Sequence, residues 1–218
     1  RYLAHQGKST RKGADELISN GKVMINGRKA VLGDKVKKTD IVEIFGNNIK
    51  NFKYYAYNKP RGVVTTNPQN GERDIIEMAK LGRSFFPIGR LDKDSHGLII
   101  ISNDGRITDR LLNPENKHQK EYVVEVDHRY TPAFLRHMQD GIQIGEYKTK
   151  PAIVKKIGET RFSIILNEGK NRQIRKMTEK LGYIVTDLKR IRIQNIELNK
   201  PHNLTPKEIK IVETRKRF

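Results

Sequence analysis

The sequence has no cysteine and no tryptophan, and none of its apolar runs is long. Without cysteine, the chain cannot form a disulfide, use a thiolate nucleophile or hold zinc or an iron–sulfur cluster through sulfur. The six histidines are scattered and show no HExxH spacing, so we expect neither a metal nor a cofactor. A membrane span needs about 18 consecutive apolar residues, and neither such a run nor the apolar core of a signal peptide is present. We therefore expect a cytoplasmic protein without membrane contact.

Acidic residues are scarce relative to basic ones. The 218 residues include 44 Lys and Arg against 25 Asp and Glu, which gives a formal net charge of +19. The excess is +6 in residues 1–50, +4 in residues 51–169 and +9 in residues 170–218, so both ends are basic. This charge indicates a polyanionic partner, and nucleic acid fits better than a membrane because the basic residues do not lie on one amphipathic helix. Lysine used only for solubility is the alternative interpretation.

Residues 1–47 predict a small separate module. Ser9 is placed to cap a helix whose apolar residues recur at helical spacing and which ends before Gly21. The pair Asn26-Gly27 between two short strand-like stretches predicts a β-hairpin. Residues 48–53 lie in a polar, turn-prone stretch that we expect to be a linker. Five basic side chains fall on the helix and the hairpin, where they can reach a phosphate backbone: Arg11, Lys12, Lys22, Arg28 and Lys29.

The remaining residues, 54–218, predict a larger α+β domain. Short apolar strands, for example 97–102 and 162–166, alternate with helices and Gly/Pro turns. The strongest helix prediction is 171–181, which Asn171 would cap and Gly182 would end. Three basic residues at i, i+3 and i+4 of this helix predict one basic ridge: Arg172, Arg175 and Lys176.

The densest group of reactive side chains lies in residues 87–98, just before an apolar strand. Asp92 and Asp94 could act as a paired-carboxylate or metal site, although an i, i+2 spacing in a loop is weak support. Ser95 and His96 are less convincing as a catalytic pair, because sequence neighbours seldom face each other. A solvated turn is the third interpretation of the segment taken alone.

Four ordered motifs together resemble those of the RsuA family of pseudouridine synthases: Asn58-Lys59-Pro60-Arg61-Gly62, Gly89-Arg90-Leu91-Asp92 with Gly97-Leu98, Lys120-Glu121-Tyr122, and Leu166 with residues 168–177. Residues 71–74 and 86–88 resemble most the RluF branch, which acts on large-subunit ribosomal RNA. Residues 1–47 resemble an S4 RNA-binding domain. The resemblance covers essentially the whole chain and implies an S4-like module followed by a catalytic domain with a mixed, mainly antiparallel central sheet and flanking helices.

The resemblance implies a metal-free isomerisation in which the glycosidic bond of a uridine moves from N1 to C5. Asp92 matches the catalytic aspartate of the family, either as the nucleophile on the anomeric carbon or as the base for a ribose proton. Both roles need an ionised carboxylate. Burial alone would favour the protonated acid, whereas a guanidinium in contact would favour the carboxylate and orient it. Arg175 matches the position of that partner, and a phosphate contact is the alternative role for it.

The resemblance also implies that the target base is flipped out of the RNA. An enzyme cannot reach a stacked base, so extrusion costs a few kcal/mol. Tyr122 matches the residue that stacks on the flipped uracil, although it could instead be a core tyrosine on the face of its strand. Arg90 resembles the arginine at the vacated stack, with a salt bridge to Asp94 or Glu121 as the alternative.

The predicted partner is therefore RNA, as a ribosomal stem-loop or a transfer RNA, bound by a monomer through Arg172 and the basic residues above. A second hypothesis is a non-catalytic ribosome-assembly factor that binds ribosomal RNA with both basic ends. A third is a metal-dependent nuclease built on Asp92 and Asp94. The enzymatic hypothesis requires Asp92, Tyr122 and Arg175 to converge in one basic cleft.

Overall fold

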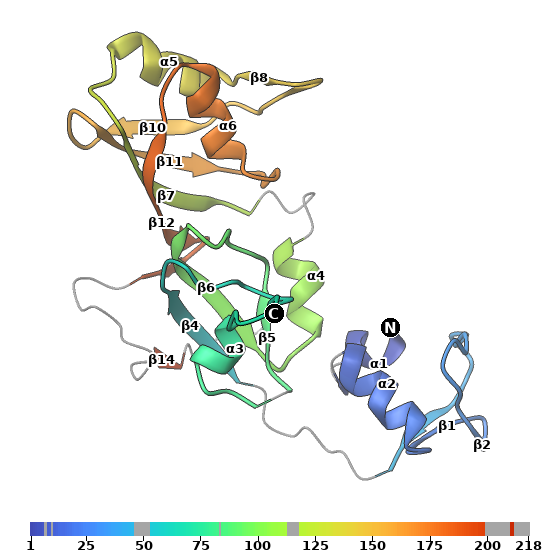
Figure 1. Ribbon diagram of the computed structural model, residues 1–218. Coiled ribbons are helices and arrows are strands. Elements are labelled where there is room, and N and C mark those ends of the chain that lie inside the picture. The colour runs from blue at the N-terminus through green and yellow to red at the C-terminus, as the bar shows by residue number, and fades with distance from the viewer. Residues whose placement is uncertain are drawn as a thin grey trace.

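The computed structural model describes residues 1–6, 8–9, 11–45, 53–82, 84–112, 118–198 and 210–211. A small N-terminal module lies beside a larger domain that contains the main sheet (Figure 1). Within this described part, no helix has the length and apolar character to cross a membrane.

The N-terminal module packs two helices on a three-stranded sheet. The turn between the first two strands has φ of 49° at Asn26 and 78° at Gly27, the positive pair that a tight hairpin requires, so the predicted hairpin is confirmed. Leu17, Val23 and Ile25 are among the buried residues of its own apolar core. The elements are α1 Tyr2–His5, α2 Arg11–Ser19, β1 Val23–Ile25, β2 Arg28–Lys29 and β3 Val42–Ile44, with strand order β2-β1-β3.

The main sheet has nine strands along the path β10-β11-β7-β12-β6-β4-β14, with β5 and β13 attached to β6 and β12. Every pairing is antiparallel except that of β6 with β12, which confirms the predicted mixed, mainly antiparallel sheet. The strands are β4 Tyr54–Lys59, β5 Phe86–Ile88, β6 His96–Ser102, β7 Lys120–Val126, β10 Ile153–Lys156, β11 Arg161–Leu166, β12 Val185–Ile193, β13 Ile196–Glu197 and β14 Lys210–Ile211. A separate hairpin pairs β8 Gln143–Ile144 with β9 Tyr147–Lys148.

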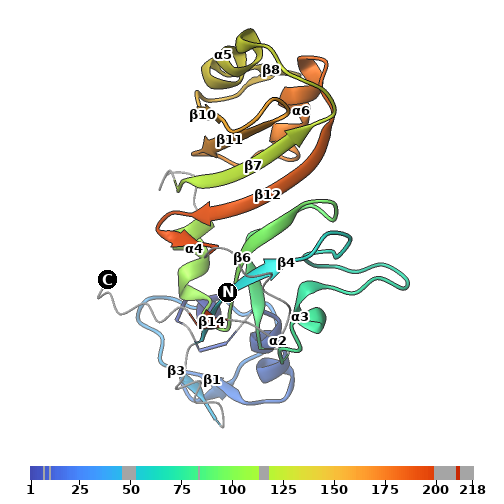
Figure 2. The ribbon, with the colours of Figure 1, turned by 90° about the vertical axis from the view of Figure 1, so that its left-hand side faces the viewer.

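The sheet has two halves, each with its own apolar core. In one half, α5 Pro132–Asp140 and α6 Gln173–Lys180 pack on β7, β10 and β11, and Phe134, Phe162 and Met177 are buried there. In the other half, α3 Ile75–Met78 and α4 Arg106–Leu112 lie beside β6. Strand β6 is buried on both faces, because Ile99 belongs to one cluster and Ile100 to another. Figure 2 shows the two halves one above the other, with β12 between them.

One detail of the predicted helix 171–181 is wrong. The N-cap residue is Arg172, not Asn171, and it has a left-handed backbone with φ of 50° and no side-chain capping bond. Gly182, with φ of 87°, follows the helix end as expected. Because Arg172 stands before the first helical turn, it does not continue a straight ridge with Arg175 and Lys176.

The predicted linker, residues 48–53, lies outside the described residues except for Lys53. The N-terminal module nevertheless meets the larger domain through another contact. A Cβ atom added to Gly105, at the start of α4, would come within 2.7 Å of the carbonyl oxygen of Ala4 in α1. The close approach of α1 to α4 therefore requires glycine at this position (Figure 1).

The parallel contact between β6 and β12 depends on Gly97. This glycine pairs with Arg190 at φ +100°, and an added Cβ would lie 2.3 Å from the Arg190 carbonyl oxygen. No other residue type fits unless the strands separate. Gly71 offers a matched comparison, because it has φ +77° and nothing within 4 Å of an added Cβ.

We expect Gly71→Ala to cost about 1–2 kcal/mol from its left-handed backbone alone. Gly97→Ala should cost about 1–3 kcal/mol more, because the methyl group is forced against backbone. The free energies of unfolding of both variants, measured by denaturant titration, test this. Equal losses would show that the β6–β12 contact does not need the glycine.

Candidate active site

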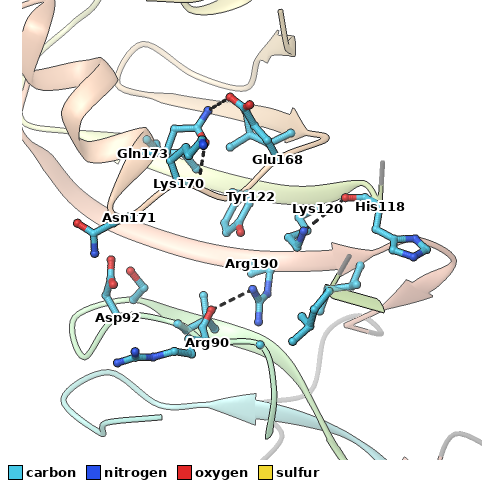
Figure 3. Close-up of a pocket in the computed structure, with 18 of the residues that line it drawn as sticks. Arg90, Asp92, His118, Lys120, Tyr122, Glu168, Lys170, Asn171, Gln173 and Arg190 are labelled. Atoms are coloured by element: carbon cyan, nitrogen blue, oxygen red, sulfur yellow. Dashed lines mark hydrogen bonds between the residues drawn. The ribbon is translucent and has the colours of Figure 1, made fainter. Parts of the chain in front are cut away.

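A cleft of about 720 Å³ opens where the two halves of the main sheet meet (Figure 3). Strands β7 and β12 form its floor, the loop before β6 forms one side, and the segment between β11 and α6 forms the other. Its lining includes four of the five residues proposed for the substrate: Arg90, Asp92, Tyr122 and Arg172.

Asp92 lies in a loop that backbone contacts hold firmly. Thr65 Oγ1 donates to the carbonyl oxygen of Leu91 (2.6 Å) and accepts from the amide nitrogen of the same residue (3.1 Å). The amide of Ser95 donates to the carbonyl of Asp92 (3.0 Å) and closes a turn. With Leu91 buried beneath it, the loop fixes the carboxylate of Asp92 at the cleft rather than in a free solvated turn.

Lys59, at the end of β4, is completely buried under this loop. Its Nζ atom donates to the carbonyl oxygens of Pro60 (3.0 Å), Lys93 (3.2 Å) and Ser95 (2.7 Å). Burial lowers the pKa of Lys59 to about 8, and the nearby charges of Asp92 and Asp94 act in the opposite direction. Lys59 thus holds the Asp92 loop through three backbone carbonyls.

Two arginines place positive charge near Asp92. Arg172 Nη1 lies 4.0 Å from Asp92 Oδ2, with both side chains partly exposed. Arg175, the partner that the sequence predicts, instead donates from Nη1 to the Val185 carbonyl (3.1 Å), and its Nε and Nη2 are buried without a hydrogen-bond partner. Burial lowers the pKa of Arg175, as does the charge of Arg172, whereas Asp92 raises it. Asp92 is therefore within electrostatic range of Arg175, but its ion pair is with Arg172.

Tyr122 lies on the cleft floor. It is half-buried, and it packs against the apolar clusters of both halves of the sheet, so it is part of the core boundary and of the cleft lining at once. Arg190 is its direct neighbour on β12 and is only 3% exposed. Arg190 Nε donates to the Leu98 carbonyl (2.6 Å) and Nη1 to the Arg90 carbonyl (3.4 Å). The Arg90 side chain is exposed beside the cleft (Figure 3).

The predicted RNA-binding residues are dispersed. Arg28 forms a two-bond contact with Asp34 (2.9 and 3.0 Å), which engages part of its charge within the module. Arg11, Lys22 and Lys29 are exposed, and the side chain of Lys12 lies outside the described part. Lys176 is exposed on α6, and its Nζ atom lies 3.4 Å from Asn171 Oδ1.

Several cleft residues were given no role from the sequence, although Lys120 and Glu168 lie within the motifs quoted above. Glu168 is buried and accepts hydrogen bonds from Tyr147 and Gln173, and the bond from Tyr147 raises the pKa of that phenol. Lys120 and Arg190 also line the cleft. Strand alternation could have indicated Lys120, since it stands two residues before Tyr122. Lys120 and Arg190 meet in the cleft from segments that are distant in the sequence, so no local pattern could have brought them together. Among the described residues, no group of three His, Cys, Asp or Glu side chains is arranged to hold a metal ion.

Comparisons with known proteins agree with this architecture. The family model described as RNA pseudouridylate synthase matches residues 53–180, and the S4 domain model matches residues 1–42. The dual-specificity RNA pseudouridine synthase RluF of Escherichia coli K12 is 42% identical over 205 residues, which cover 91% of this chain and 70% of that protein. The ribosomal large subunit pseudouridine synthase B of Bacillus subtilis is 34% identical, covering 96% of this chain and 93% of that protein.

A crystal structure of a pseudouridylate synthase shares the fold, with a TM-score of 0.67 and 24% identity over 91% of this chain and 89% of that one. That structure shows the fold, and the two family models define the class of protein as an RNA-modifying enzyme with an S4 domain. The chain belongs to the RNA pseudouridylate synthase family, in its RsuA type, and is an RNA pseudouridine synthase.

The burial of Lys59 predicts a pH dependence of stability. Its pKa is about 8 in the folded protein and about 10.5 when unfolded, so between these values the folded state binds fewer protons. The unfolding free energy of the wild type, relative to Lys59→Met, should therefore rise from pH 8 to pH 10.5, by an amount on the order of 3 kcal/mol.

Lys93→Met is the control, and its effect on the unfolding free energy should change with pH in the opposite direction. The ion pair with Glu72 raises the pKa of Lys93, so the stability that Lys93 contributes should be lost as the pH rises through that raised value. Denaturant unfolding at a series of pH values measures both differences. If the difference in unfolding free energy between the wild type and Lys59→Met does not change with pH, burial does not disfavour the charged form of Lys59.

Proposed function

We propose that this chain converts uridine to pseudouridine in large-subunit ribosomal RNA. The relative in Bacillus subtilis, named as a ribosomal large subunit pseudouridine synthase, supports this substrate class, and the relative in Escherichia coli supports RNA as the substrate. We assign RNA capture to the S4 domain, residues 1–47, and the isomerisation to residues 54–218, joined through 48–53. A net charge of +19 suits a substrate that presents a phosphate backbone to both parts.

Asp92 is the catalytic residue of this proposal. The observation that carries it is the position of its carboxylate: fixed in a braced loop, inside the cleft, with Arg172 at 4.0 Å and Tyr122 on the floor. The carboxylate acts at the ribose, as nucleophile on C1′ or as base for the neighbouring proton, and both routes need it charged. Arg172 and Arg175 supply the compensating positive charge.

Tyr122 and Arg90 serve the flipped nucleotide. The exposed part of the Tyr122 ring offers a flat apolar face to the uracil, and such stacking contributes about 1–3 kcal/mol per base. The exposed Arg90 side chain lies beside the cleft, where it can occupy the position that the base vacates in the RNA stack. Lys176 and the basic residues of the S4 domain contact phosphates away from the cleft.

The first test is Asp92→Asn, with Asp94→Asn as the matched control. Asp94 is an exposed carboxylate in the same loop that does not line the cleft. We expect Asp92→Asn to lower pseudouridine formation by at least about a thousandfold, because the reacting group is lost. RNA affinity should stay within about threefold, because phosphate contacts dominate it. Asp94→Asn should keep the wild-type rate.

Mapping of pseudouridines in cells that lack the gene, complemented with wild type or Asp92→Asn, identifies the substrate. A uridine of large-subunit ribosomal RNA should be modified only with the wild type. Modification confined to transfer RNA would reject the proposed substrate, and full turnover by Asp92→Asn would reject the proposed catalytic residue.

The second test separates the ring of Tyr122 from its hydroxyl group. Tyr122→Phe keeps the stacking face and should retain most of kcat/KM. Tyr122→Leu should lose roughly 5- to 150-fold, the equivalent of one base stack. Because Tyr122 also packs against two apolar clusters, the unfolding free energy of each variant is measured in parallel. Equal losses for both variants would show that the hydroxyl group matters rather than the ring.

A further inference from the structure

Two cations lie next to Tyr122 on the cleft floor without an assigned role. Lys120 precedes Tyr122 by two residues on β7, and Arg190 pairs with Tyr122 across the β7–β12 ladder. Residues at these positions share one face of a sheet. Figure 3 shows the Lys120 side chain beside the Tyr122 ring, on the side toward Arg190.

Neither cation is neutralised. In the described part of the chain, no carboxylate is paired with either side chain, and the Nη2 atom of Arg190 is buried without a hydrogen-bond partner. Among the described residues, Lys120 Nζ makes one polar contact, a long one of 3.5 Å to the His118 carbonyl. Burial lowers the pKa of Lys120, and the charge of Arg190 lowers it further. Two neighbouring positive charges, one buried and one half-buried, are costly unless a ligand brings negative charge.

The position of the pair indicates which part of the RNA it meets. Asp92 and Arg172 are 36% and 47% exposed at their side chains and so lie toward the mouth, whereas Arg190 is 3% exposed. In the proposed complex, the ribose must reach Asp92, and the base lies deeper, against Tyr122. The edge of a base stacked on Tyr122 therefore faces Lys120 and Arg190, while the phosphates remain outside.

We propose that Lys120 and Arg190 stabilise the uracil as it leaves the ribose, an inference that rests on the proposed function. When the C1′–N1 bond breaks, the bonding electron pair stays on the uracil and spreads over N1 and the two carbonyl oxygens. Asp92 compensates for the electron deficiency at C1′. The C5–C1′ bond then forms, C5 loses its proton, and N1 gains one, so the composition is unchanged. Lys120 faces the reacting base directly. Arg190, on the cleft floor, adds a second positive charge that stabilises the negative charge on the uracil.

The test compares Lys120→Met on two RNA substrates that differ only at the target position, which is uridine or 5-fluorouridine. Fluorine withdraws electrons and makes the base a better leaving anion. We expect Lys120→Met to slow single-turnover loss of the target uridine by about 100- to 1000-fold at saturating RNA. Conversion of 5-fluorouridine is followed by nucleoside analysis after digestion. The factor by which Lys120→Met slows this conversion should be at least about tenfold smaller than the factor for uridine. Lys120→Arg, which keeps the charge, should recover most of the rate.

Lys155→Met provides the matched control, because Lys155 is an exposed lysine of the same sheet, on β10, outside the cleft. It should match the wild type on both substrates. Equal losses for uridine and 5-fluorouridine with Lys120→Met would overturn the proposal in favour of a structural role. A change confined to the RNA dissociation constant and its salt dependence would overturn it in favour of a phosphate contact. Conversion by the wild type, measured in the same series, tests the proposed function separately.

Discussion

The cleft depends on the parallel contact between β6 and β12. Each half of the main sheet has its own apolar core, and this pairing is what joins them into one sheet. At the junction, Gly97 allows the backbone of Arg190 to approach more closely than any side chain would permit. The same junction brings the loop of Asp92, which precedes β6, opposite Tyr122 on β7. Close backbone packing at one point therefore sets the spacing of the site.

In the described part of the chain, several buried or half-buried basic side chains have no carboxylate partner. Lys59, Lys120 and Arg175 all have a lowered pKa, with burial as the main cause. Lys59 is satisfied by three backbone carbonyls and braces the Asp92 loop, whereas Arg175 and Arg190 keep unpaired donors. Uncompensated charge weakens a folded protein but suits an enzyme whose ligand is a polyanion. The arrangement favours function over maximal stability.

The sequence predicted the elements better than their connections. The hairpin at Asn26-Gly27, the strands at 97–102 and 162–166 and the end of α6 at Gly182 follow from turn chemistry and apolar periodicity, which act locally. The long strand β12 was not predicted from the sequence. The beginning of α6 did not follow, because Arg172 adopts a left-handed conformation that propensity disfavours. The motif resemblance placed Asp92 and Tyr122 correctly in one cleft, but it paired Asp92 with Arg175 rather than Arg172.

By itself, the sequence determined the family, the α+β composition, the two-part organisation and the identity of the candidate reacting carboxylate, since motifs and local periodicity are written along the chain. Only the tertiary structure decided which cation pairs with Asp92, why Lys59 is buried, and that Lys120 and Arg190 lie beside Tyr122. Arg172 is 80 positions from Asp92, and the Lys93 and Ser95 carbonyls that hold Lys59 are 34 and 36 positions from it. Arg190 is 68 positions from Tyr122. These relations depend on strand order and register across a parallel junction, which no local pattern encodes.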